Sequence, residues 1–232
     1  MENRVDNNIS IIIPAYNEQD LLPSCLDSIL SQTANPALFD IVVIDNNSTD
    51  LTASIARNKG VRVEKEPKKG YVYAIRKGVE VSEGSILAFL DADCRAPVNW
   101  VSKIITNFES TTDVLALGGK LDFYDLNPII NQIVKFILYF INNLPGNNMA
   151  IKREALDQIG GIDPNVNLST DFWITMKLRQ AGRIKIDKSM VVLTSGRRFK
   201  GALASQLQYF VNVISMLLLA RPVFFNFPDV RM

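Results

Sequence analysis

Two carboxylates one residue apart follow an apolar run in the segment SILAFLDADCRAPVNW, residues 85–100. In an extended segment residues i and i+2 point the same way, so we expect Asp91 and Asp93 to face one side and Ala92 to face the protein. Bringing two ionised carboxylates together is costly unless a cation compensates them. Mg²⁺ and Mn²⁺ prefer hard oxygen ligands and complete their shell with water and phosphates. The pair therefore indicates a divalent-cation site that could neutralise a diphosphate leaving group.

An isolated Asp-x-Asp sequence is common in exposed turns, so the elements around it must decide. The continuous run at 9–14 predicts a fully buried strand, the segments 39–45, 61–64 and 86–90 predict three more strands, and helical patterns alternate with them. This alternation predicts right-handed βαβ units and a parallel sheet, which binds ligands at the carboxyl ends of its strands. Residues just past the predicted strand ends could line one crevice; they are Asn17, Asp45, Lys69 and Asp91.

The composition excludes several kinds of site. The chain has 232 residues, of which 47% are hydrophobic, enough for one large α/β domain. It has no histidine, so any proton transfer must use Asp, Glu, Lys or Tyr. Cys25 and Cys94 are far apart and in no metal-ligand spacing, which favours a reducing compartment. The net charge of +1 argues against nucleic acid as a partner.

The predicted first βα turn and the N-terminal residues before the first strand exclude further kinds of site and segment. The first βα turn reads PAYNE and lacks the glycines of a dinucleotide-binding turn, and the sequence contains no P-loop. The polar N-terminus MENRVDNNIS lacks the apolar core of a signal peptide. We therefore expect a cytoplasmic protein, with a peripheral place on the inner face of the cytoplasmic membrane left open.

Several segments together resemble the family 2 glycosyltransferases of GT-A type. They are, in order, SIIIPAYNE, IVVIDNNSTDLT, KKGYVYAIRKGVEVSEGSILAFLDAD, GNNMAIKREALDQIGGID and STDFWITMKLRQAG. The resemblance implies an α/β fold with a Rossmann-like, mixed but mostly parallel sheet flanked by helices. A GT-A domain would span 1–200, with a nucleotide-sugar-binding half at 9–95 and an acceptor half at 96–200, followed by an apolar helical extension at 201–232.

The resemblance also implies roles for individual residues. Asp93 would ligate Mn²⁺ or Mg²⁺, and Asp45 would hydrogen-bond the base of the nucleotide. The loop and helix containing Lys69, Gly70 and Arg76 would close over the nucleotide. The residues that would bind the nucleotide sugar are Pro14, Ala15, Tyr16, Glu18, Asp45, Lys69, Gly70, Arg76, Asp91, Ala92, Arg197 and Arg198.

The acceptor side departs from the family pattern at one position. In the family the helix before LRRAG usually opens with Glu-Asp, and here the matching residues are Thr170 and Asp171. Asp171 is thereby implied as the catalytic base of an inverting transfer, since a carboxylate can take the proton of an attacking hydroxyl. The missing glutamate leaves the acceptor open, because a phosphate acceptor is already ionised and needs no strong base. Arg197 and Arg198 could bind phosphate oxygens or simply form a solvated basic loop.

These features predict a metal-dependent, inverting glycosyltransferase that uses a UDP- or GDP-linked sugar. The acceptor would be a glycan hydroxyl, membrane-proximal or lipid-linked, or a polyprenyl phosphate. A non-catalytic nucleotide-sugar-binding or scaffold protein is an alternative, suggested by the missing glutamate. A sugar-phosphate nucleotidyltransferase is a weaker one, because it would need a glycine-rich first loop with a lysine, and PAYNE is not such a loop.

The most hydrophobic segment of the chain is 202–227, ALASQLQYFVNVISMLLLARPVFFNF. The pair Arg221-Pro222 interrupts it, so it is a poor candidate for a membrane span of ~20 apolar residues. We expect this segment to lie in the membrane interface or to form a homodimer contact.

Overall fold

The computed structural model describes residues 8–141, 143–166, 169–197, 211 and 215. Its eight-stranded sheet has the strand order β3-β2-β1-β4-β7-β6-β8-β5. The strands are β1 (Ile9–Ala15), β2 (Phe39–Asp45), β3 (Arg62–Lys65), β4 (Ile86–Phe89), β5 (Cys94–Arg95), β6 (Val114–Phe123), β7 (Met149–Lys152) and β8 (Arg183–Thr194). The helices are α1 (Leu22–Leu30), α2 (Thr52–Asn58), α3 (Tyr71–Val81), α4 (Trp100–Ser110), α5 (Pro128–Ile141), α6 (Arg153–Gln158) and α7 (Thr170–Ala181), with a short 3₁₀ helix at Pro36–Leu38.

The sheet is mixed, and its N-terminal half is parallel. β1 pairs in parallel with β2 and β4, and β2 with β3, as the alternating pattern predicts. The C-terminal half enters through β7, which is antiparallel to both β4 and β6, while β8 runs parallel to β6. β6 and β8 are longer than their apolar runs suggest, since β6 continues into half-buried sequence after its run and β8 begins in half-buried or exposed, polar sequence before its run. This architecture confirms the predicted fold class.

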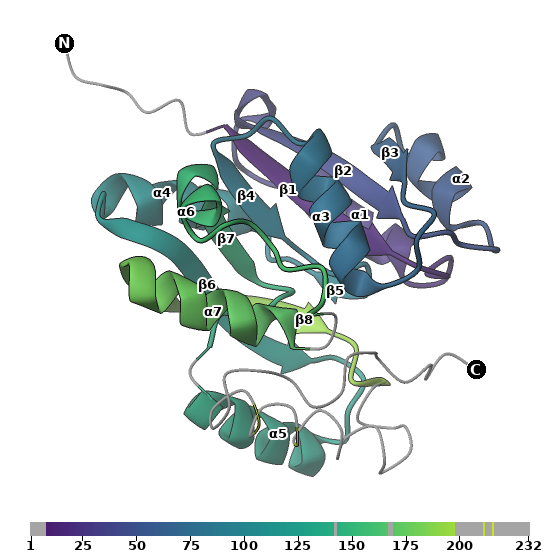
Figure 1. The fold of residues 1–232 in the computed structure, drawn as a ribbon. Coiled ribbons are helices and arrows are strands. Elements are labelled where there is room, and N and C mark those ends of the chain that lie inside the picture. The colour runs from purple at the N-terminus through teal and green to yellow at the C-terminus, as the bar shows by residue number, and fades with distance from the viewer. Residues whose placement is uncertain (1–7, 142, 167–168, 198–210, 212–214, 216–232) are drawn as a thin grey trace.

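Helices cover both faces of the sheet (Figure 1), which explains why β1 is buried throughout. Ile11 and Ile13 pack on one face with α1 and α4, while Ile12 packs on the other face with α3, α6 and α7. The close approach of α3 to β1 depends on Gly78, because a Cβ at that position would lie 2.3 Å from the Ile12 side chain. The core therefore fixes the carboxyl end of β1, where the candidate site begins.

Helix α5 lies outside these layers, at the bottom of the view in Figure 1. Asn131 and Lys135 attach it to β6 through Asp122, at 2.8 and 2.9 Å. Of the α5 side chains up to residue 136, which the structure describes, the exposed large apolar ones are Ile129, Ile130, Ile133 and Phe136. Among the described residues, no helix is both long and apolar enough to cross a membrane. Of the predicted extension 201–232, only residues 211 and 215 are described, and Arg198 also lies outside the described residues.

Candidate active site

A pocket opens where the carboxyl ends of β1 and β4 meet. The residues that line it are Pro14, Glu18, Tyr71, Asp91, Ala92, Asp93 and Arg197. They come from the end of β1, the loop after it, the first turn of α3, the turn after β4 and the residues that follow β8. The predicted convergence at this sheet edge is therefore present, because parallel neighbouring strands end on the same side.

The acid pair lies in a tight turn. Leu90 still continues the sheet ladder by donating its N–H to the Ile12 carbonyl at 3.2 Å, but Cys94 N–H then turns back to the Asp91 carbonyl at 3.0 Å. The expectation of an extended segment was thus wrong. The turn nevertheless brings both carboxylates to the pocket, with Ala92 buried in the core between them.

Asp93 is held by groups from the C-terminal half of the chain. Because β5 pairs with β8, Thr194 lies opposite Cys94 and donates its hydroxyl to Asp93 Oδ1 at 3.5 Å. Cys94 Sγ lies 3.7 Å from the same oxygen. Burial, reinforced by the charges of Asp93 and Asp91, raises the pKa of the Cys94 thiol well above its usual value, so Cys94 remains a donor. Asp93 is only 7% exposed and is therefore fixed in orientation.

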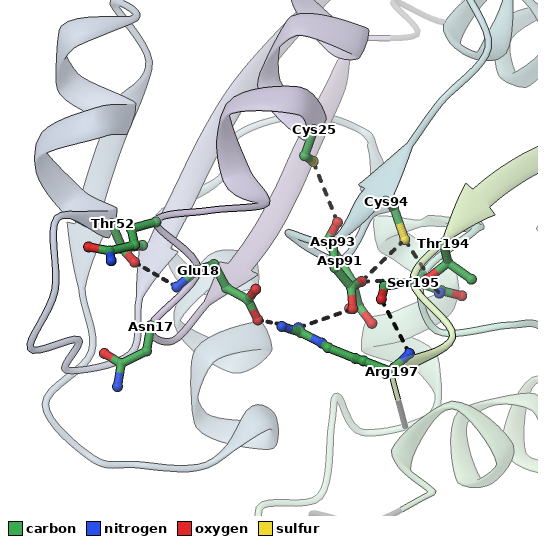
Figure 2. Close-up of polar contacts among 12 residues, drawn as sticks. Asn17, Glu18, Cys25, Thr52, Asp91, Asp93, Cys94, Thr194, Ser195 and Arg197 are labelled. Carbon is green, nitrogen blue, oxygen red and sulfur yellow. Dashed lines mark hydrogen bonds and ion pairs between the residues drawn. The ribbon is translucent and has the colours of Figure 1, made fainter. Parts of the chain in front are cut away.

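Arg197 spans the pocket between two acids, as Figure 2 shows. Its Nη2 lies 2.5 Å from Glu18 Oε1 and 3.0 Å from Asp93 Oδ2. Burial disfavours the charged guanidinium, but the hydrogen bond with Glu18 and the negative charges of Asp93 and Glu18 outweigh this cost and raise the pKa of Arg197. Arg197 is therefore a permanent positive charge inside the pocket.

Glu18 is buried, and its loop is fixed by the neighbouring βα loop. Glu18 N–H donates to the Thr52 hydroxyl at 2.8 Å, and Asn17 N–H donates to the Ser48 hydroxyl at 3.0 Å. Asn17 Oδ1 in turn accepts a hydrogen bond from Thr49 N–H at 2.9 Å, and the backbone of Asn17 has a positive φ of 50°. These bonds aim the Glu18 carboxylate at Arg197.

The other residues predicted on the nucleotide side gather at the ends of β1, β2 and β3. Lys69 Nζ donates to the Tyr16 hydroxyl at 2.9 Å and lies over the same ring. Gly70 N–H donates to Asn46 Oδ1 at 2.8 Å, and Asp45 accepts from Ser48 N–H at 3.1 Å. Ala15 is buried at the end of β1.

Arg76 has a different environment. It lies on α3, and its guanidinium donates to the main-chain carbonyl of Ile162, in the segment after α6. It does not belong to the residues that line the pocket. In the structure Arg76 joins two parts of the fold, and its predicted nucleotide contact stays a prediction.

Asp171, the predicted base, adjoins Gly146, which in turn adjoins the pocket residue Tyr71. It is in the first turn of α7. Its carboxylate accepts hydrogen bonds from the N–H of the next residue, Phe172, at 2.9 Å and from Asn143 Nδ2 at 3.5 Å. A Cβ on Gly146 would lie 3.2 Å from Asp171 Cβ and 3.3 Å from the hydroxyl of Tyr71, which lines the pocket. Gly146 thus adjoins both Asp171 and the Tyr71 hydroxyl.

Thr170 does not replace the glutamate of the family pattern chemically. Its side chain is 2% exposed, and its hydroxyl donates to the Val166 carbonyl at 2.5 Å. The residue therefore closes the start of α7 and presents no acid or base to the pocket.

Comparison with known proteins places the chain in a family. Residues 10–161 match the model of the family described as Glycosyl transferase family 2. The chain belongs to the family 2 glycosyltransferases.

Curated relatives of this family 2 chain include two proteins of Haloferax volcanii. Glycosyltransferase AglE is 37% identical over 192 residues, which cover 75% of this chain and 62% of the relative. Glucosyl-dolichyl phosphate glucuronosyltransferase is 23% identical over 184 residues, which cover 70% of this chain and 58% of the relative. The chain thus spans less than two thirds of the length of either relative.

A solved structure shows the same fold. The mannosyltransferase PcManGT from Pyrobaculum calidifontis, in complex with GDP-Man and Mn²⁺, superposes with a TM-score of 0.74 at 20% identity. The match covers 91% of this chain and 64% of PcManGT. At this identity the likeness shows the fold alone, and it confirms the predicted GT-A type.

The carboxylates of the pocket fit a divalent cation. Glu18, Asp91 and Asp93 offer hard oxygen ligands to one space, and a positive charge already lies against Asp93 in the form of the Arg197 guanidinium. Within the described ranges, no three Asp, Glu, His or Cys side chains form a ready-made metal cluster. This donor set suits Mg²⁺ or Mn²⁺, which use one or two carboxylates and share the remaining positions with water and phosphates.

Sequence reasoning missed several residues of the site. Tyr71 reads as a helix residue, although its place directly after Lys69-Gly70 puts it at the mouth of a βα loop. Asn147 supports Asp93 indirectly, because its side chain donates to Cys94 Sγ at 3.5 Å and to the Thr194 hydroxyl at 3.3 Å. The motif GNNMA was a signal for Asn147, whereas nothing local marked Thr194.

Proposed function

We propose that this chain transfers a sugar from a nucleotide-diphosphate sugar to a hydroxyl group, with inversion at the anomeric carbon and with a divalent cation. The observation that carries the proposal is the convergence of Glu18, Asp91 and Asp93 on one pocket whose Tyr71 wall adjoins Asp171. This arrangement offers a place for the diphosphate and, beside Tyr71, a base for the acceptor.

On the donor side, Asp93 would ligate Mn²⁺ or Mg²⁺, and Asp91 would orient the sugar or ribose. The cation, when bound, would neutralise the negative charge that develops on the departing diphosphate. Thr194 and Cys94 keep Asp93 Oδ1 occupied, which leaves Oδ2 as the oxygen that faces the cationic partner, at present Arg197. The Tyr16–Lys69 pair would border the base of the nucleotide.

On the acceptor side, Asp171 would accept the proton of the attacking hydroxyl. The hydroxyl oxygen forms a bond to the anomeric carbon, the bond from that carbon to the diphosphate oxygen breaks, and the diphosphate leaves with the electron pair. Asn143 and the N–H of Phe172 donate hydrogen bonds to the Asp171 carboxylate and so hold its orientation. Attack from the side opposite the leaving group gives inversion.

We propose further that the acceptor is the hydroxyl of a lipid-linked sugar. Asp171 supports a hydroxyl, which needs a base, over a free phosphate, which does not. The exposed Ile129, Ile133 and Phe136 of α5 support a lipid environment, because large apolar side chains on one helix favour the membrane interface. Asn143, just after α5, touches Asp171, so this helix lies next to the acceptor side. The glucuronosyltransferase relative is also named for a lipid-linked sugar.

Product analysis tests this function directly. UDP- and GDP-linked sugars are incubated with lipid-linked sugar acceptors and Mn²⁺, and the product's anomeric configuration is read by NMR. We expect transfer with inversion, and loss of transfer in Asp93→Asn. Donor binding without any turnover would favour the scaffold alternative, and retention of configuration would contradict the role of Asp171.

A further inference from the structure

The Arg197 guanidinium occupies the place where the pocket chemistry calls for a metal cation. One nitrogen, Nη2, contacts both Glu18 Oε1 at 2.5 Å and Asp93 Oδ2 at 3.0 Å. Thr194 and Cys94 already donate to Asp93 Oδ1. A metal ion approaching Asp93 therefore competes with Arg197 for the same oxygen.

The charges around the pocket favour the binding of a cation beside Asp93. Three carboxylates and one guanidinium line it, so the formal charge of these residues is negative and attracts a further cation. Glu18 and Asp93 are 4% and 7% exposed, and buried carboxylates are costly to leave without a positive partner. Arg197 supplies that partner as long as nothing else does.

The position of Arg197 also allows its guanidinium to move away from Glu18 and Asp93. Its side chain remains 30% exposed, and it follows the last strand, β8, rather than lying within it. The main chain just before it is anchored, since Ser195 Oγ and Gly196 N–H both donate to Asp125, at 2.8 and 2.5 Å. A change of side-chain rotamer would therefore move the guanidinium without moving β8. Guanidinium groups bind paired phosphate oxygens especially well.

We propose that Arg197 couples metal and nucleotide binding. It occupies Asp93 while the nucleotide is absent, and it moves to the diphosphate when the nucleotide arrives, which frees Asp93 for the metal. This inference rests on the proposed function. It means that metal alone binds weakly and that metal and nucleotide bind together.

Direct binding measurements on Arg197→Gln test the coupling. Mn²⁺ affinity without nucleotide is measured from the EPR signal of free Mn²⁺, and UDP and GDP affinities are measured by calorimetry at saturating Mn²⁺. We expect the variant to bind Mn²⁺ alone about tenfold more tightly, because its competitor is gone, and to bind the nucleotide about tenfold more weakly, because a phosphate contact is lost. A purely structural role would not shift the two affinities in opposite directions.

Three further variants make the result specific. Arg197→Lys keeps the charge without the planar fork and should give intermediate affinities for both ligands; it also serves if Arg197→Gln does not fold. Asp93→Asn combined with Arg197→Gln should lose the tight Mn²⁺ binding. Arg183→Gln, which removes an equally charged side chain from an exposed pair with Asp113, should change neither affinity.

The outcomes separate this inference from the function beneath it. If the wild-type protein binds neither UDP nor GDP with Mn²⁺, the proposed function fails. If the wild type binds the nucleotide, but both Arg197 variants bind Mn²⁺ alone no more tightly than the wild type, only the coupling is overturned. If the Arg197 variants bind both Mn²⁺ and the nucleotide more weakly than the wild type, the coupling is also overturned.

Discussion

The carboxylate of Asp93 receives contacts from Thr194, Cys94 and Arg197, which lie in or after β5 and β8. Asp91, two residues earlier, is placed by the turn that Cys94 closes. Two aspartates at one sheet edge are thus positioned differently, Asp93 by side-chain contacts and Asp91 by a backbone turn. Single residues decide the chemistry here, and the two most informative are Asp171 and Gly146.

Replacing Asp171 by Asn removes the predicted base but keeps the size of the side chain. We expect kcat to fall by about 10² to 10⁴, the usual contribution of general base catalysis. Nucleotide affinity should change little, because Asp171 does not line the donor pocket. Rapid-quench turnover and calorimetric nucleotide binding check the two halves of this prediction. A variant with normal kcat would exclude Asp171 as the base.

Replacing Gly146 by Ala inserts a methyl group between Asp171 and Tyr71, at 3.2 and 3.3 Å from their nearest atoms. Contacts this short must be relieved by small shifts, so we expect kcat to fall while nucleotide binding is retained. Tyr71→Phe removes the crowded hydroxyl, and the double variant should therefore recover part of the lost activity. Strict additivity of the two substitutions, measured in a double-mutant cycle, would show that the three residues are not coupled.

At the scale of elements, the loops after β1 and β2 act as one unit. Thr52 accepts from Glu18 N–H at 2.8 Å and donates to Asp50 at 2.5 Å. Thr52→Val keeps the shape but leaves the Glu18 N–H without its acceptor, which costs about 1–3 kcal/mol for a buried donor. We expect the free energy of unfolding and the nucleotide affinity both to fall. Thr49→Val, at an exposed position of the same loop, is the matched control.

The same loops should respond to acid. Burial opposes the charge of Asp50, but hydrogen bonds from the Thr52 side chain and backbone and from the Gln19 backbone outweigh it and lower the pKa of Asp50. A lowered folded pKa means that Asp50 stabilises the protein above its unfolded pKa of about 3.9, and that this stability is lost as the pH falls through the folded value. Denaturant titrations should show the difference between wild type and Asp50→Asn shrinking below about pH 4. A difference independent of pH would contradict it.

Helix α5 is the element that carries the proposed lipid contact. Ile133 and Phe136 are 55% and 66% exposed, and burying such a side chain in an apolar environment contributes about 1.5–3 kcal/mol. Ile133→Asn and Phe136→Ser should each weaken binding to phosphatidylcholine–phosphatidylglycerol vesicles by about tenfold or more, as measured by cosedimentation. Leu51→Ser, at a 62% exposed residue before α2, should have no effect. Equal effects of all three would indicate non-specific adsorption.

For the whole molecule, the sequence predicted the N-terminal half best. The apolar run of β1 and the acidic or polar residues after the strands are local signals, and parallel strands bring their carboxyl ends to one edge. The acid pair was found for this reason, although it lies in a turn and not in an extended segment.

The C-terminal half contributes contacts that no local pattern carries. Arg197 and Glu18 are 179 positions apart, and only the pairing of β5 with β8 brings Thr194 beside Asp93. Arg197 was singled out from its charge and from the resemblance, whereas its two acidic partners follow from the fold. The two halves of the chain thus meet at Asp93, and the proposed site exists only in the assembled sheet.

The most direct test of the central claim is whether Asp93 holds Mn²⁺ against a nucleotide diphosphate. The ³¹P NMR signals of UDP or GDP are recorded with substoichiometric protein and Mn²⁺, since enzyme-bound Mn²⁺ broadens nearby phosphorus signals. We expect wild-type protein to broaden the diphosphate signals beyond the effect of free Mn²⁺, and Asp93→Asn to abolish the excess. Equal broadening by the two proteins, or none by either, would contradict the assignment of this pocket.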